Sequence, residues 1–122
     1  MATRFDLLSR FVLDAICDDY ENLAEVSKHV GGLGQRCGLT FESGEIIRAL
    51  GDLMDRGLAR GFLLTPTSKP PKKVDRFPGE KEIGKYYFLV TQRGMDLQLA
   101  PYDEWPFDDE TVLRRDWCAP AE

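Results

Sequence analysis

Apolar residues recur at helical spacing in the first third of the chain. Across residues 4–18 they lie three or four positions apart, which is typical of an amphipathic helix whose one face packs on a core. The residues of this face are Phe5, Leu8, Phe11, Val12, Ala15 and Ile16. A shorter second helix is predicted to begin at Asn22, a favourable N-cap, with Glu25 positioned to complete a capping box. The pair Gly31-Gly32 is expected to end it, so residues 31–40 are predicted to be a glycine-rich connector.

The clearest helical pattern spans residues 43–56, with Glu42 or Ser43 at its start. Five large apolar residues form its predicted buried face: Ile46, Ile47, Leu50, Leu53 and Met54. Gly57 follows as the residue expected to adopt a left-handed conformation, and Leu58 supplies the apolar contact that usually accompanies such a helix end. The sequence therefore predicts a helix that stops sharply and turns back.

Strand-like segments follow this helix. Residues 58–65 suit a strand, and residues 83–91 suit a return strand because they are rich in aromatic and branched side chains. The prolines and glycine of the intervening segment exclude regular structure from much of a loop at 66–82. Thr91 is expected to cap a last short helix that holds Met95, Leu97 and Leu99.

The chain has 122 residues, which suits one domain with a real core. Neither a signal peptide nor a run of about 20 apolar residues is present, so no membrane association is expected. Three cysteines, Cys17, Cys37 and Cys118, leave at least one unpaired and favour a reducing compartment. A cytoplasmic location is therefore predicted.

Charge is distributed unevenly along the chain, whose formal net charge is −5. Residues 66–85 carry six basic and three acidic side chains, whereas residues 101–122 carry seven acidic and two basic ones. A basic loop and an acidic tail could attract each other or serve different partners.

Together these segments resemble the winged helix-turn-helix domain, most closely that of the PadR-like transcriptional regulators. The resemblance rests on two segments. In the predicted third helix and its end the matching residues are Gly44, Ile46, Ile47, Arg48-Ala49-Leu50, Leu53, Gly57 and Leu58. In the return strand and the start of the last helix they are Tyr86-Tyr87-Phe88-Leu89-Val90-Thr91-Gln92-Arg93-Gly94. It implies an α+β fold: a three-helix bundle with a two- to three-stranded antiparallel wing, over residues 1–100. Residues 101–122 form an acidic, aromatic-containing C-terminal extension in the place where that family has a long dimerisation helix.

The resemblance implies a small regulator of transcription that binds duplex DNA, as a homodimer, through its third helix and a long basic wing. The residues expected to contact DNA are Ser43, Arg48, Lys69, Lys72, Lys73 and Arg76. In the alternative interpretation, Arg48 and Arg56 each pair with Glu45 or Asp52 across the helix surface, and the wing lysines only keep a loop soluble. The acidic start of the helix, at Glu42 and Glu45, favours a second hypothesis, a winged-helix module that binds proteins and not DNA.

No constellation of residues in the sequence indicates an enzyme, a cofactor or a metal. His29 and Cys37 are too few for a metal site, and His29 is interpreted as a partly exposed residue at a helix end. Tyr86 and Phe88 share one face of their strand and are expected to pack in the core, not to stack on bases.

The tail aromatics Trp105, Phe107 and Trp117 allow two interpretations. They complete the core beside the first helix, which is favoured, or they fold over the wing or the helix-turn-helix surface and restrain DNA binding.

Overall fold

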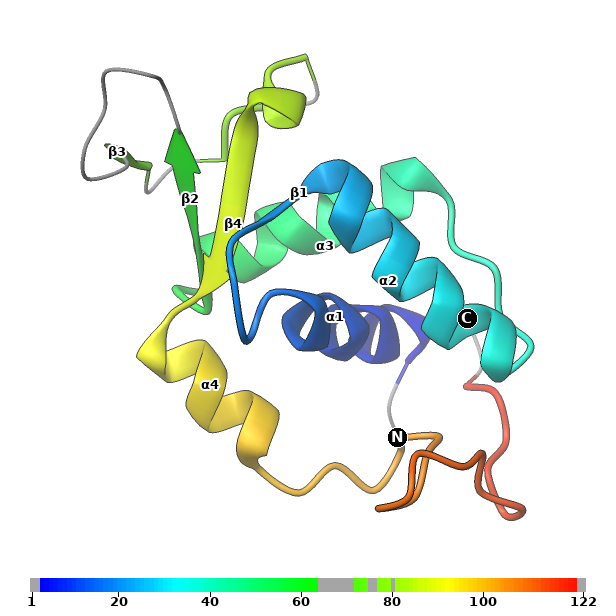
Figure 1. The fold of residues 1–122 in the computed structure, drawn as a ribbon. Helices are drawn as coiled ribbons and strands as arrows, with labels where there is room; N and C mark the ends of the chain where they lie inside the picture. Colours follow the sequence, from blue (N-terminus) through cyan, green and yellow to red (C-terminus); the bar gives the residue numbers. More distant parts are fainter. Residues whose placement is uncertain (1–2, 64–71, 75–76, 80, 121–122) are drawn as a thin grey trace.

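The computed structural model describes residues 3–63, 72–74, 77–79 and 81–120 (Figure 1). Within them the chain forms helices and a sheet, an α+β arrangement that is compatible with a winged helix. The elements, in chain order, are α1 (Arg4–Ala15), β1 (Glu21–Asn22), α2 (Leu23–Arg36), α3 (Ser43–Asp55), β2 (Ala59–Leu63), β3 (Lys72–Val74), the 3₁₀ turn η1 (Ile83–Lys85), β4 (Tyr86–Val90) and α4 (Gln92–Leu99).

The sheet is antiparallel throughout and its strands lie in the order β1-β4-β2-β3. β4 is central: Phe88 lies opposite Glu21 of β1 on one side and opposite Gly61 of β2 on the other. Two predictions hold here, since β2 and β4 lie inside the predicted strands 58–65 and 83–91. The short outer strands β1 and β3 were not expected, because two or three residues carry no detectable period.

Helix α1 begins with a reciprocal cap. The Thr3 hydroxyl accepts from the Asp6 N–H at 3.1 Å, and the Thr3 N–H donates to the Asp6 carboxylate at 2.9 Å. The predicted apolar face is confirmed at Leu8 and Phe11, which are buried. It is wrong at Phe5, which is 40% exposed because the first turn projects beyond the core.

Helix α2 begins as predicted, with the Asn22 and Glu25 side chains each capping the other's backbone N–H. Its predicted end is wrong: the helix continues through Gly31 and Gly32 to Arg36. The buried positions explain the error, since Val26, Val30 and Gly34 repeat every four residues across the glycine pair. Packing on this face outweighs the roughly 1 kcal/mol by which each glycine disfavours a helix.

Helix α3 matches its prediction to within one residue. Gly57 has φ +73°, which a residue with a side chain rarely adopts. Its N–H donates to the Met54 carbonyl at 3.0 Å, and the Leu58 N–H donates to the Leu53 carbonyl at 2.8 Å. These bonds satisfy the last carbonyls of the helix and direct the chain into β2.

Helix α4 is capped as predicted, because the Thr91 hydroxyl accepts from the Gly94 N–H at 3.1 Å. The same hydroxyl donates to the Gly57 carbonyl at 2.7 Å, which ties the start of α4 to the end of α3. The helix holds Met95, Leu97 and Leu99 as predicted, and Leu99 is 76% exposed in its last turn. None of the helices in the part of the chain that the structure describes is long and apolar enough to span a membrane.

The tail runs beneath α1 and the end of α2, away from β2 and β3 (Figure 1). Trp105 meets the buried Phe11 ring edge-on at 5.3 Å, and the Arg36 guanidinium lies 4.4 Å from the centre of the Phe107 ring. The favoured interpretation, core completion, is therefore confirmed. The described tail contains no helix; a bridge between Phe107 and Leu113 closes a tight loop there.

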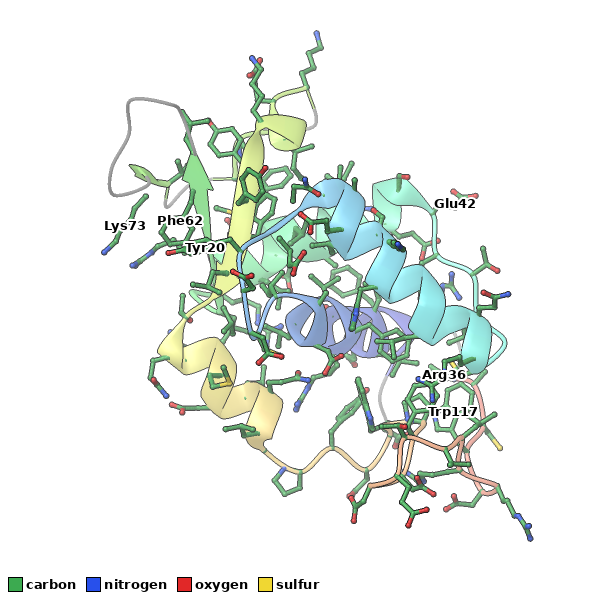
Figure 2. The ribbon with its side chains drawn as sticks, in the orientation of Figure 1. Tyr20, Arg36, Glu42, Phe62, Lys73 and Trp117 are labelled. Carbon is green, nitrogen blue, oxygen red and sulfur yellow. The ribbon has the colours of Figure 1, made fainter. Side chains whose placement is uncertain are left out.

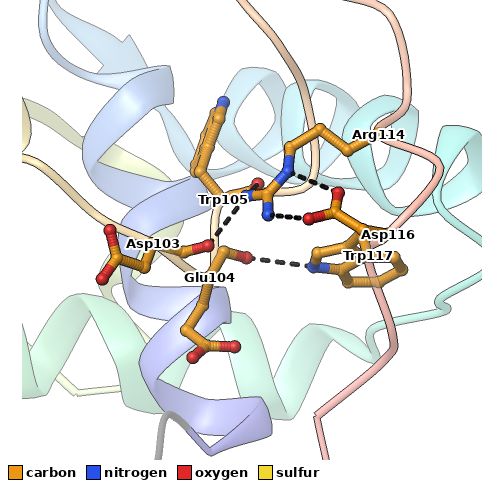
Figure 3. A network of polar contacts seen from close by, with 6 residues as sticks. All are labelled: Asp103, Glu104, Trp105, Arg114, Asp116 and Trp117. Atoms are coloured by element: carbon orange, nitrogen blue, oxygen red, sulfur yellow. Dashed lines mark hydrogen bonds and ion pairs between the residues drawn. The ribbon is translucent and has the colours of Figure 1, made fainter.

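Arg114 holds the two halves of the tail together (Figure 3). Its guanidinium donates to the Asp103 and Trp105 carbonyls at 2.7 and 2.8 Å and pairs with Asp116 at 3.0 Å. The Trp117 indole N–H donates to the Glu104 carbonyl at 3.0 Å (Figure 3). A segment without a helix or strand is thus fixed by side chains that bond backbone carbonyls.

Candidate nucleic-acid interface

The first two turns of α3 present an open polar surface. Ser43, Gly44 and Arg48 are exposed, while Ile46 and Ala49, one turn apart on the other side, are buried. Ser43 lies at the helix N-terminus, where the free backbone N–H groups and the helix dipole favour anionic groups. Two of the residues expected to contact DNA, Ser43 and Arg48, therefore lie on one accessible end of the helix.

The acidic residues at this end are engaged by other partners. Glu45 pairs with Arg4 of α1 at 3.2 Å, and one of its carboxylate oxygens also accepts from the Glu42 N–H at 3.5 Å. Asp52 pairs with Arg56 at 3.4 Å. Among the described residues neither acid pairs with Arg48, so the alternative interpretation is wrong for Arg48, but the Asp52–Arg56 pair confirms it for Arg56. Only the Glu42 carboxylate stays near the helix start as an exposed acid (Figure 2).

A hollow of about 390 Å³ opens beside this helix end. It lies between the first turn of α1 and the first turns of α3, and its lining residues are Thr3, Arg4, Phe5, Glu42, Glu45 and Arg48. The exposed Phe5 ring thus belongs to the same surface as Arg48.

The middle of α3 is covered by the loop that follows β3. A Cβ placed on Gly51 would lie 3.4 Å from the Phe77 ring, so the ring rests on the bare backbone of the helix. Phe77 also packs against the buried core. This contact was missed because Phe77 lies in a proline-containing loop and Gly51 in a helix, and no local pattern relates them. Phe77 therefore covers the side of α3 that carries Gly51.

The wing lysines are only partly described. Lys73 is exposed on β3, the outermost strand, and lies apart from the core (Figure 2). Lys72, also in β3, pairs through its backbone with Leu63 of β2, and its side chain lies outside the described residues. Lys69 and Arg76 lie outside the described residues altogether. Within the predicted loop 66–82, residues 72–74 thus form a short strand paired with β2.

The outer face of the sheet carries aromatic side chains. Phe62 of β2 lies opposite Tyr87 of β4 and Lys73 of β3, and the Tyr20 ring meets the Phe62 ring edge-on at 4.9 Å (Figure 2). Phe88 faces the core and is fully buried, as predicted from strand alternation. The contact between Tyr20 and Phe62 was not predicted from the sequence, because the two residues are far apart along the chain.

His29 lies within α2 and not at a helix end, because α2 is longer than predicted. Its Nε2 is 2.7 Å from the Asp14 carboxylate, and this hydrogen bond raises the pKa of His29 above its usual value. The other Asp14 oxygen accepts from the Gln98 amide at 3.2 Å. The pair joins α1, α2 and α4; it has no third ligand, and the described residues hold no cluster of side chains suited to a metal ion.

Comparison with known proteins yields no matching family model, and no match among curated proteins or solved structures.

Proposed function

We propose that the chain is a winged-helix domain that binds duplex DNA and regulates transcription in the cytoplasm. The order of elements carries the proposal: helix, short strand, two helices, then a hairpin, with β1 and β2 flanking β4. In a winged helix of this order, α2 and α3 would be the helix-turn-helix and the segment after β2 would be the wing.

The open end of α3 supports DNA as the ligand. In helix-turn-helix proteins the N-terminal residues of the second helix meet base edges in the major groove. Here that end offers Ser43 and Arg48, while the nearest internal acid, Glu45, is neutralised by Arg4. Arg48 would contact guanine or phosphate, and the Ser43 hydroxyl a phosphate.

The wing would supply the phosphate contacts. Lys73 and its neighbours Lys69, Lys72 and Arg76 would follow the backbone beside the groove that α3 enters. Because the chain carries a net charge of −5, binding would depend on this local cluster and fall steeply with salt. A homodimer would place two such surfaces on adjacent half-sites.

Fluorescence anisotropy tests the proposal, with a mixed-sequence duplex at about 50 and 200 mM salt. Two variants remove the contacts, Arg48→Ala and the double change Lys72→Glu with Lys73→Glu. The matched control is Lys28→Glu, an exposed charge reversal on α2. Binding that weakens at least tenfold or so with salt and with either variant, but not in the control, supports DNA contact by α3 and the wing.

The second hypothesis, a winged-helix module that binds a protein, is favoured by one observation. Phe77 covers the middle of α3, which shortens the surface available to a DNA groove. No DNA binding at the lower salt, in a protein whose circular dichroism is that of a folded domain, would favour this module over the regulator.

A further inference from the structure

Helix α2 carries a straight stripe of exposed residues on the side that faces away from the core. The residues of this α2 stripe are Glu25, His29, Gly32 and Arg36. They are spaced four, three and four positions apart, which at 3.6 residues per turn places them within about 60° of arc on the helix surface. Alternation of three and four positions is the spacing by which two helices pack along a common seam.

The α2 stripe lines a groove of about 530 Å³. Ala15 at the end of α1 and the half-buried Leu33 of α2 line the same groove and give it apolar surface. A Cβ added at Gly32 would meet no atom within 4 Å, so the middle of the stripe is bare helix backbone. Because the distance between two packed helices is set by the side chains at their contact, a second helix can approach closely here.

The two ends of the α2 stripe carry opposite charges. At one end the Glu25 carboxylate accepts from the Asn22 N–H at 3.3 Å and pairs with no described cation. At the other end the Arg36 guanidinium donates to the Thr111 carbonyl, lies over the Phe107 ring and pairs with no described carboxylate (Figure 2). The two charges are eleven residues apart, or about 16 Å along the helix axis.

A second copy of α2, turned antiparallel about a two-fold axis at the middle of the stripe, complements each of these features. Glu25 faces the partner's Arg36 at both ends of the seam. The His29 side chain, which is 44% exposed, lies over the bare backbone of the partner's Gly32. A parallel copy would oppose like charges, a uniformly acidic helix would leave Glu25 unmatched, and a uniformly basic one would leave Arg36 unmatched.

We propose that a second copy of the chain packs antiparallel on the α2 stripe, so that α2 forms the interface of a homodimer. The contact is isologous, since each copy presents the same residues to the other. Helix α2 has 14 residues and is about 21 Å long, so the contact is small and we expect a dissociation constant on the order of 10–100 µM. The inference stands on α2 alone and holds whether or not the chain binds DNA.

Sedimentation equilibrium of the full chain at about 5 to 500 µM tests the proposal. We expect the mean mass to rise with concentration from 13.9 kDa towards twice that value. Gly32→Arg fills the middle of the seam and should weaken association at least about tenfold. The matched control is Gly31→Arg, at an exposed glycine of the same helix that lies outside the groove; it should leave the dissociation constant within about twofold.

A charge exchange tests the antiparallel pairing itself. Glu25→Arg opposes two cations at both ends of the seam, and Arg36→Glu opposes two anions, so each variant alone should associate at least about fivefold more weakly. An equimolar mixture of the two variants should regain the affinity of the wild type, because opposite charges then face each other at both ends. If circular dichroism shows that either variant is unfolded, the comparison of Gly32→Arg with Gly31→Arg decides.

Three results would overturn the proposal. The first is a mass of 13.9 kDa at every concentration. The second is association that Gly32→Arg leaves unchanged, which would place the contact on another surface. The third is a mixture of the two folded charge variants that associates no better than either alone. None of these results changes the binding of DNA measured by anisotropy, so the failure of this inference and that of the proposed function are seen separately.

Discussion

Replacing two glycines of α2 by alanine should have opposite effects on stability. A Cβ added at Gly32 meets no atom within 4 Å, whereas one added at Gly34 would lie 2.7 Å from the Leu39 carbonyl oxygen and 3.4 Å from the Phe41 ring. Gly32→Ala should therefore stabilise the protein by about 0.5–1 kcal/mol, the ordinary gain of alanine over glycine in a helix. Gly34→Ala must displace the backbone that leads into α3, which costs about 1–3 kcal/mol.

Comparing the two variants removes most of the intrinsic preference for helix, because both sites lie in the same helix. The difference between their unfolding free energies should be about 1–3 kcal/mol, or about 4–12 °C in Tm at roughly 4 °C per kcal/mol. Thermal unfolding followed by circular dichroism measures it. Equal rises in Tm would refute the close approach of α2 to Leu39 and, with it, the position of the loop before α3.

Other consequences can be measured separately. Trp105→Ala should lower the free energy of unfolding, measured by urea titration, by about 2–3 kcal/mol, because it removes the ring contacts to Phe11 and Phe107. The control Val112→Ala, at an exposed site, should change this free energy by less than about 0.5 kcal/mol. Since the folded state raises the pKa of His29, the bond to Asp14 stabilises most below pH 6.5 and loses its contribution as pH rises through the folded pKa. The stability difference between wild type and Asp14→Asn should thus shrink as pH rises above about 6.5; a constant difference contradicts the bond. Burial raises the pKa of Cys17 to about 11, so iodoacetamide at about pH 8 should modify the exposed Cys118 well before Cys17, as peptide mass spectrometry would show. Equal rates at the two thiols would contradict the burial of Cys17.

The sequence predicted those parts of the fold whose signals are local. The Asn22–Glu25 capping pair, the Thr91 cap and the Gly57 stop depend on residues a few positions apart, and the structure has each of them where it was expected. The end of α2 was missed because the stop depends on tertiary packing: Gly34 faces the loop at Leu39, and the chain turns only at Gly38, with φ +79°. A glycine pair alone does not reveal whether its helix is held by neighbours.

The candidate interface could be predicted only in part, because some of its contacts join segments that are distant in sequence. Ser43 and Arg48 were expected to contact DNA from the resemblance, and both are exposed in the first half of α3. The partners of the neighbouring acids were not predictable, since Arg4 meets Glu45 across 41 positions of sequence. Phe77 over Gly51 and the Tyr20–Phe62 contact likewise join distant segments.

The most direct test of the proposed function is a ¹H–¹⁵N NMR titration of the full chain with a short duplex at low salt. We expect the largest shift changes at the backbone amides of residues 43–48 and 72–74, with little change in α4 and the tail. Changes confined to the tail, to the Tyr20 and Phe62 surface, or absent altogether would contradict binding of DNA by the start of α3 and the wing.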